Sequence, residues 1–363
     1  GQSLAFIRIP NEKDAIIFNP RRTALPWSIW RHDFSTDETY QLWQAAEGTG
    51  SAFRFISAER QLFWTKEERI VFPYEGNGWT QLWSIPSTGG AAQNMMSKGA
   101  FEVQFASLAQ DGKTILYSSN QFDIDRQHIW KVNYKSKPIK LTNTRGIEWA
   151  PVSTQNSIYC LASSGTKYAS LYRIDDQLRL IQTLESNFPS SDQLVAPQQV
   201  IFSAADGMQI HGQLLMPKKL DKDKKHPALL FFHGGSRRQM LLGFHHRGYY
   251  HNAYALNQYL ASQGYVVLSV NYRSGIGYGM EFREALSYGA GGASEFNDVL
   301  GAGLYLQSLP EVDDRKIGLW GGSYGGYLTA LGLAKASDLF AAGVDIHGVH
   351  DWNAVIKNFM PQY

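Results

Sequence analysis

The sequence predicts a partial β-propeller over residues 1–190, followed by an α/β fold with a mostly parallel sheet over residues 191–363. Two observations predict this division. The first region repeats a strand pattern with a period in the low-to-mid forties, which is typical of propeller blades. The second region alternates strand-like with helix-like segments, which is typical of parallel βαβ units. The pattern changes after residues 189–192.

The repeat of the first region consists of an apolar triplet, a polar turn and a second strand with an aromatic residue. The triplets at residues 70–72, 115–117 and 158–160 are 45 and then 43 residues apart. The aromatic residues that follow them, 47 and then 42 residues apart, are Trp83, Trp130 and Tyr172. Residues 16–18 with Ile29 and Trp30 form a looser first copy. A single blade cannot bury both of its faces, so blades stack around a ring.

About four blades are visible, at the lower limit for a closed ring, so further blades are expected before Gly1. A β-sandwich, the alternative all-β fold, would not produce so long a regular repeat. In the second region we expect a hairpin, four later strands and three helices. The hairpin covers 200–202 and 210–216, the strands 228–232, 266–270, 317–320 and 341–346, and the helices 252–263, 295–309 and 325–336.

Composition excludes several classes of protein. Lys and Arg total 34 against 32 Asp and Glu, a net charge of +2, which argues against a nucleic-acid partner. No run of 18 apolar residues is present, so no membrane span is expected within the chain. The single cysteine, Cys160, lies in an apolar run and is expected to be buried. Compartment and oligomeric state stay open, and no cofactor is expected.

The strongest motif is Gly-Gly-Ser-Tyr-Gly-Gly at residues 321–326, between a strand and an apolar helix. A Gly-x-Ser-x-Gly sequence in that setting is typical of the nucleophile elbow of α/β-hydrolases, with Ser323 as the nucleophile. His-Gly-Gly at 233–235 ends an earlier strand, where this fold places part of its oxyanion hole. The backbone N–H groups of Tyr324 and Gly235 are therefore the predicted oxyanion donors.

Further motifs make the chain resemble the prolyl oligopeptidase family of serine peptidases, which includes dipeptidyl and acylaminoacyl peptidases. These motifs are residues 271–279, Glu295, Asp298, residues 312–313 and the elbow, all in the family's order. The resemblance is densest over residues 198–363 and extends to the propeller. It implies a serine peptidase that acts on short peptides.

The resemblance also implies candidate pocket residues. His233 stands where several relatives have a tyrosine that donates to the oxyanion, and Ser236 stands where the family usually has proline. Val355 and Phe359 match the segment that lines the pocket for the residue before the scissile bond, which should be apolar. Both are equally compatible with an ordinary helix face in the core.

The remaining triad members are not expected within the chain. The order in this fold is Ser, Asp or Glu, then His, and only 40 residues follow Ser323. The sequence therefore predicts that the chain stops short of the triad acid and base and is inactive as it stands. Asp345, His347 and His350 are better explained as loop or supporting residues. A metal site at His245, His246 and His251 is not favoured, since no Cys or carboxylate stands at ligand spacing.

The predicted function is thus a peptidase that forms an acyl-enzyme on Ser323 beneath a propeller that admits short substrates. An esterase with the same elbow and an inert binding module are the alternatives. Glu295 and Asp298 lie three residues apart at the start of a helix, where acidic groups are stabilised by the helix dipole. We expect both to have a structural role.

Overall fold

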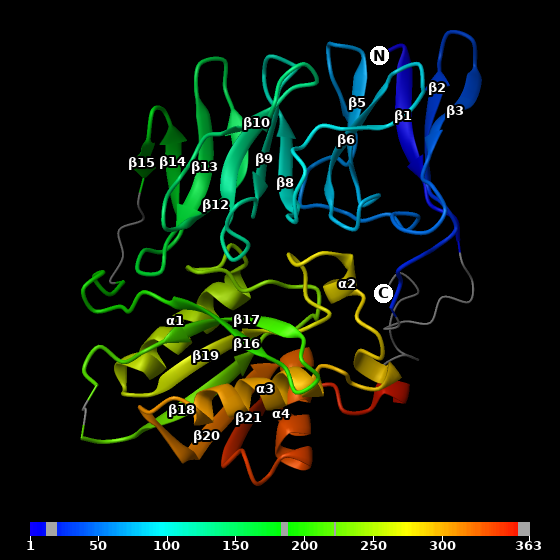
Figure 1. Cartoon of the computed structure of the whole chain (residues 1–363). Helices are drawn as coiled ribbons and strands as arrows, with labels where there is room; N and C mark the ends of the chain where they lie inside the picture. Colours follow the sequence, from blue (N-terminus) through cyan, green and yellow to red (C-terminus); the bar gives the residue numbers. More distant parts are fainter. Residues whose placement is uncertain (12–19, 183–187, 221–222, 355–363) are drawn as a thin grey trace.

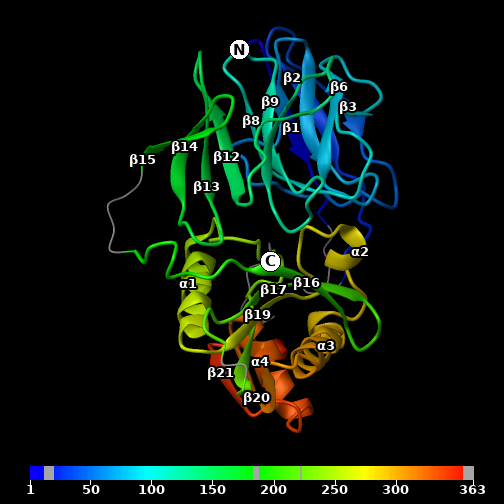
Figure 2. The same ribbon diagram turned by 60° about the vertical axis from the view of Figure 1, so that its left-hand side comes forward.

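The computed structural model describes residues 1–11, 20–182, 188–220 and 223–354. Two regions are stacked on one another (Figure 1). The N-terminal region, β1 to β15, consists of small antiparallel sheets that stand side by side above the C-terminal region. The C-terminal region, β16 to β21, is a single mixed sheet with helices on both faces. Figure 2 shows the same two layers from another side.

The N-terminal region holds one three-stranded and three four-stranded sheets among its described residues, each with its strands in sequence order. The first sheet is β1 (Ser3–Arg8), β2 (Ser28–Asp33) and β3 (Glu38–Gln44). The second is β4 (Phe63–Trp64), β5 (Arg69–Tyr74), β6 (Gln81–Pro86) and β7 (Gln93–Asn94). The third is β8 (Val103–Leu108), β9 (Ile115–Ser119), β10 (His128–Val132) and β11 (Ile139–Lys140). The fourth is β12 (Ile147–Ser153), β13 (Ile158–Ser163), β14 (Ser170–Ile174) and β15 (Leu178–Gln182).

Strand register supports the sequence repeat. Trp83 pairs with Phe72, Trp130 with Tyr117 and Tyr172 with Cys160, so the last residue of each triplet faces the aromatic residue of the next strand. These three aromatic residues therefore occupy equivalent positions on the third strand of their sheets, as the repeat predicts.

The looser first copy needs a correction. Ile29 and Trp30 belong to the second strand of the first sheet, because Ile29 pairs with Trp43 of the third strand. Trp43 is the counterpart of the other aromatic residues, because its partner Ile29 corresponds to Phe72, the partner of Trp83. The triplet at residues 16–18 lies outside the described residues.

The sheet of the C-terminal region has the strand order β16-β17-β19-β18-β20-β21. The first two strands form the predicted hairpin, and β19, β18, β20 and β21 run parallel. The strands are β16 (Gln198–Ser203), β17 (Gln209–Leu215), β18 (His226–Phe232), β19 (Val266–Asn271), β20 (Val312–Gly322) and β21 (Ala342–Ile346). The helices are α1 (Gly248–Ser262), α2 (Met280–Arg283), α3 (Phe296–Gln307) and α4 (Tyr324–Lys335), with a 3₁₀ turn at Gly289–Gly291. The predicted strands and long helices are all present, whereas α2 and the 3₁₀ turn were not predicted.

Alternation along the strands separates the two faces of this sheet. Val267 of β19 packs with Ala261 of α1, whereas its neighbour Leu268 belongs to the larger core with Leu328 of α4 and Val299 of α3. Successive side chains of a strand point to opposite faces, so α1 covers one face and α3 with α4 covers the other. These layers hold the carboxyl ends of the parallel strands rigidly at one edge, toward the N-terminal region.

The contact between α3 and the hairpin gives a test of this packing. A Cβ at Gly301 of α3 would lie 2.7 Å from the Cα of Ala204, whereas one at Gly248 would meet nothing. We expect Gly301→Ala to lower the free energy of unfolding by about 1–3 kcal/mol through overpacking. The matched control Gly248→Ala should be neutral or stabilising by up to about 1 kcal/mol. Urea unfolding measures both, and equal effects would contradict the packing.

Candidate functional site

Ser323 occupies a strained turn between β20 and α4. Its φ is 56° and its ψ is −117°, a conformation that residues with a side chain rarely adopt. The side chain is half-buried. Glycine is required on both sides because the elbow contacts β18 closely. A Cβ at Gly321 would lie 2.6 Å from the carbonyl oxygen of Phe232, and one at Gly325 would lie 2.7 Å from the carbonyl carbon of the same residue.

The structure brings Ser323 and the His-Gly-Gly segment together. Both follow the carboxyl ends of neighbouring strands, β20 and β18. A Cβ at Gly234 would lie only 3.3 Å from the Cβ of Ser323. Gly235, with φ at 126°, follows directly. The N–H groups of Gly235 and Tyr324 donate no hydrogen bond to any residue that the structure describes, so both are free to donate to a substrate oxygen.

Glu295 fixes the residue after the nucleophile. The Tyr324 hydroxyl donates a hydrogen bond to the Glu295 carboxylate, which also accepts from Ser274 Oγ at 3.1 Å and from the Gly289 N–H at 3.1 Å. The Tyr324 ring stacks on Tyr272 with a 5.9 Å centroid separation. Burial raises the pKa of Glu295. The first bond holds Tyr324 and the other two hold the Glu295 carboxylate, which supports the structural role expected for Glu295.

Asp298 has a similar supporting position. Its buried carboxylate accepts from the Arg273 guanidinium at 2.7 Å and from the Arg273 N–H at 2.7 Å. The same guanidinium reaches Asp206 in the hairpin turn at 2.6 Å. Arg273 thus ties α3 to both β19 and the hairpin, which again supports a structural role for Asp298.

The side chain of His233 is buried beneath the His-Gly-Gly segment and does not lie on an open surface. The ring is fully buried and stacks on Tyr272 at 4.3 Å, and its Nδ1 is placed to donate to the Gly234 carbonyl at 2.9 Å. Burial lowers the pKa of His233 to about 3, so the ring is neutral near pH 7. Val355 and Phe359, the other two pocket candidates, lie outside the described residues.

None of the described histidines hydrogen-bonds to the Ser323 hydroxyl. Asp345 and His350 instead pair with each other, at 2.6 Å between Oδ2 and Nε2, and Asp345 also accepts from the Gly348 N–H. The side chain of His347 comes near Gly322, where an added Cβ would lie 3.6 Å from its Cε1. A base for Ser323 is therefore not provided by these contacts.

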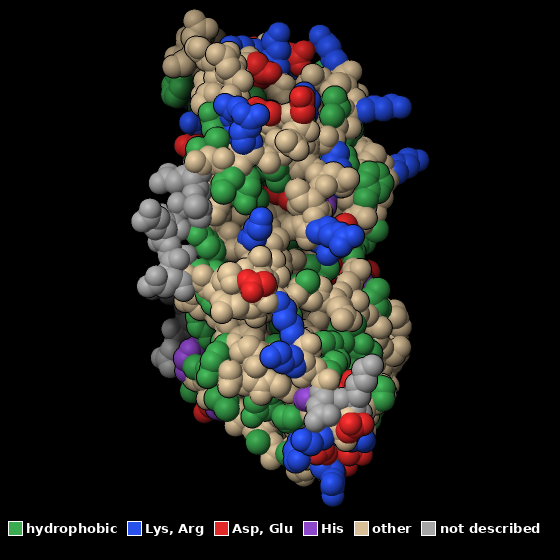
Figure 3. Space-filling view, turned by 90° about the vertical axis from the view of Figure 1, so that its left-hand side faces the viewer, with side chains coloured by type: hydrophobic (Ala, Val, Ile, Leu, Met, Phe, Trp, Pro, Cys, Tyr) green, Lys and Arg blue, Asp and Glu red, His purple; other side chains and the backbone are tan. Residues whose placement is uncertain are grey.

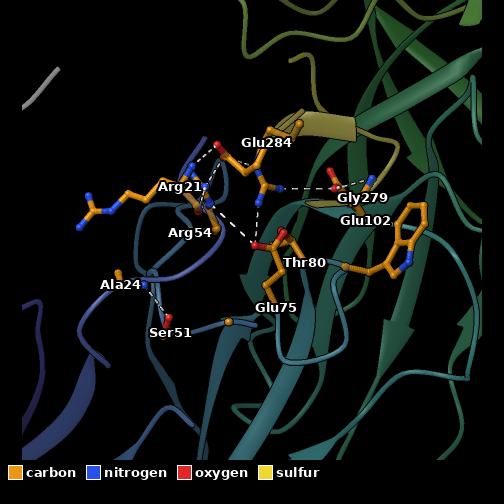
Figure 4. A network of polar contacts seen from close by, with 12 residues as sticks. Arg21, Ala24, Ser51, Arg54, Glu75, Thr80, Glu102, Gly279 and Glu284 are labelled. Atoms are coloured by element: carbon orange, nitrogen blue, oxygen red, sulfur yellow. Dashed lines mark hydrogen bonds and ion pairs between the residues drawn. The ribbon is translucent and has the colours of Figure 1, made fainter. Parts of the chain in front are cut away.

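A buried ionic network joins the two regions next to this site (Figure 4). Glu284 of the C-terminal region accepts from Arg54 of the N-terminal region and from Arg237 at 2.9 Å. Arg283 reaches Glu75 of the N-terminal region at 2.6 Å. Burial acts to raise the pKa of Glu284, but the arginines hold it below its ordinary value. Sequence analysis missed this network, because its partners lie some two hundred residues apart and share no motif.

A cavity of about 360 Å³ opens beside this network. Residues 53–57 and 102–104 line it from the N-terminal region, and residues 237–239 and 245–247 line it from the C-terminal region. Arg238 packs against the oxyanion loop, since a Cβ at Gly235 would lie 3.2 Å from its Cγ. The structure thus places a cavity next to the loop that carries one predicted oxyanion donor.

Other expectations concern the wider molecule. Cys160 is buried, and desolvation raises its pKa to about 12. The described residues contain no group of His, Cys, Asp and Glu side chains that could hold a metal ion. No helix in the described part of the chain is long and apolar enough to cross a membrane. On the face shown in Figure 3, basic and acidic side chains are interspersed over both regions.

The role of Glu295 can be tested by substitution. Glu295→Ala leaves the Tyr324 hydroxyl without its buried acceptor and should lower the free energy of unfolding by about 1–3 kcal/mol. Glu295→Gln keeps a side chain of the same length with an acceptor oxygen, so it should lower the free energy of unfolding by less. The exposed control Asp314→Ala should stay within about 0.5 kcal/mol. Urea unfolding measures all three. An unchanged stability with lost reactivity of Ser323 in Glu295→Gln would instead indicate acid–base chemistry.

Comparison with known proteins gives the same assignment as the motifs. Residues 252–363 match the prolyl oligopeptidase family, and residues 24–170 match the dipeptidyl peptidase IV N-terminal region. A probable dipeptidyl peptidase 4 of Aspergillus fumigatus is 28% identical over 313 residues, covering 82% of this chain and 40% of that protein. The chain thus spans well under half the length of this curated relative.

Solved structures share the fold. A puromycin-hydrolysing peptidase of Mycobacterium tuberculosis superposes with a TM-score of 0.79 at 16% identity, over 99% of this chain and 54% of that one. An acylaminoacyl peptidase of Pyrococcus horikoshii superposes with a TM-score of 0.68 at 20% identity, covering 97% of this chain and 52% of the chain of that peptidase. At such identities the likeness shows the fold alone, a propeller followed by a hydrolase domain. Residues 252–363 thus form a domain of the prolyl oligopeptidase family, preceded by a dipeptidyl peptidase IV N-terminal region.

Proposed function

We propose that the protein is a serine peptidase that hydrolyses short peptides through an acyl-enzyme on Ser323. The observation that carries the proposal is the conformation of Ser323, a positive φ on a turn between a parallel strand and a helix. Backbone strain of this kind persists where it positions a reacting group. Relatives named as dipeptidyl and acylaminoacyl peptidases support a peptide substrate.

In the proposed reaction the Ser323 oxygen attacks the scissile carbonyl, and a base takes its proton. The carbonyl oxygen becomes an oxyanion, which the N–H groups of Gly235 and Tyr324 stabilise. The N-terminus of α4 adds a favourable dipole at the same point. Glu295 and Tyr272 keep Tyr324 in place, so the donor is fixed before substrate binds.

The N-terminal region supports the restriction to short substrates. Its sheets stand above the C-terminal sheet (Figure 1), and its residues 53–57 and 102–104 face residues 237–239, just after Gly235, across the cavity. The cavity between the regions, about 360 Å³, has room for a few residues of extended peptide but not for a folded domain. An esterase needs no such cover, and this favours the peptidase.

Labelling of the intact protein with a fluorophosphonate tests the nucleophile. We expect labelling that is lost in Ser323→Ala and kept in Ser308→Ala, an exposed serine at the end of α3. On short peptide substrates, kcat/KM should fall by roughly 10⁴-fold or more in Ser323→Ala.

Two results would contradict the proposal. Hydrolysis of simple esters without any hydrolysis of peptides would identify an esterase. Absence of labelling in the intact protein, with its fold retained by circular dichroism, would identify a non-catalytic member.

A further inference from the structure

Most of the charge around the cavity between the two regions is internally balanced. Arg54, Arg237 and Arg283 all contact carboxylates of the ionic network. Glu102, the only carboxylate among the described residues that line the cavity, accepts from the Gly277 N–H at 2.8 Å and lies 3.7 Å from Arg283. Three glutamates, Glu75, Glu102 and Glu284, thus face three arginines.

Arg238 and Arg247 line the same cavity and have no such partner. Neither forms an ion pair with any described residue. Arg238 donates to the Arg237 carbonyl at 2.7 Å and to the Tyr250 hydroxyl, and its buried Nε lacks an acceptor. The two side chains are close enough to repel: burial and then Arg238 lower the pKa of Arg247. Two cations without a carboxylate partner among the described residues therefore line the same cavity.

The histidines of the cavity do not add to this charge. Burial, followed by the nearby arginines, lowers the pKa of His246 to about 4. His245 is fully buried, and desolvation lowers its pKa strongly. Both rings are neutral near pH 7, so the positive potential of this wall comes from the guanidinium groups alone.

The cations lie close to the nucleophile. The Tyr250 hydroxyl, which accepts from Arg238, lies 3.2 Å from where a Cβ of Gly234 would stand. That same point is 3.3 Å from the Cβ of Ser323. Peptide residues advance about 3.3–3.6 Å each when extended, so a substrate bound at Ser323 reaches the guanidinium groups within a few residues.

We propose that Arg238 and Arg247 form a subsite for a carboxylate of the peptide substrate. Guanidinium groups bind carboxylates through paired, charge-assisted hydrogen bonds, which here would also satisfy the buried Nε of Arg238. The carboxylate comes either from the free C-terminus or from an acidic side chain. The subsite rests on the proposed function for its substrate class, and gives the peptidase a preference for anionic peptides.

Isothermal titration calorimetry tests the subsite without turnover, by measuring peptide binding to the Ser323→Ala variant of the intact protein. One pair of short peptides differs only in a free or amidated C-terminus, and a second pair, both amidated, differs only in one Glu or Gln. We expect the anionic member of at least one pair to bind roughly ten-fold more tightly at low salt. A preference in the first pair identifies the C-terminus as the source, and one in the second identifies the side chain.

Arginine variants connect the preference to the two residues. Arg247→Gln, at an exposed position, should reduce the preference several-fold, and adding Arg238→Gln should abolish it. If the double variant is unfolded by circular dichroism, Arg247→Gln and the charge-retaining Arg238→Lys are compared instead. The control Arg315→Gln, an exposed arginine of the C-terminal region outside the cavity, should leave the preference unchanged.

The outcomes separate this subsite from the proposed function. Equal affinity for anionic and neutral peptides, a preference that persists in the folded double variant, or an undiminished preference in Arg247→Gln would overturn the subsite. Loss of Ser323 labelling with the preference retained would instead overturn the peptidase and support the subsite.

Discussion

The arrangement of the two regions depends on a set of carboxylates and guanidinium groups buried between them. Glu284 and Glu75 have side chains almost closed to solvent, and Arg283 lies between them. Removing such charges from water costs several kcal/mol each, and only well-placed partners offset the cost. Their contribution is therefore to geometry more than to stability. A shift of one region against the other would leave buried charges unpaired, which disfavours alternative arrangements.

The geometry of the candidate site depends on this ionic network. Arg237 belongs to the network through Glu284, and it stands two residues after Gly235 and next to Arg238. The oxyanion loop is therefore held from two sides, by the network and by the close approach of Gly234 to Ser323. Glu295 and Tyr272 fix Tyr324 from a third direction. The proposed reacting centre consists mostly of backbone, and buried side chains such as Glu295 keep that backbone in position.

Much of this structure could be predicted from local patterns in the sequence. The blade repeat predicted equivalent positions for Trp83, Trp130 and Tyr172, because each position depends on strand pairing within about twenty residues. The elbow and the His-Gly-Gly segment were recognisable because these close backbone contacts leave room only for glycine, a constraint that few other turns share. The looser copy at Ile29 and Trp30 was misassigned because Ser28 interrupts the apolar triplet of its strand. The ionic network and the cavity arginines could not be predicted, since charge pairing between distant segments follows no spacing rule.

The buried network also makes the two regions unequal in charge where they meet. Within it, the N-terminal region contributes Arg54 with two glutamates, and the C-terminal region contributes Glu284 with two arginines. One surface thus has an excess negative charge, and the other has an excess positive charge. The two surfaces are therefore complementary in charge, and a displaced arrangement would bring like charges together at the junction.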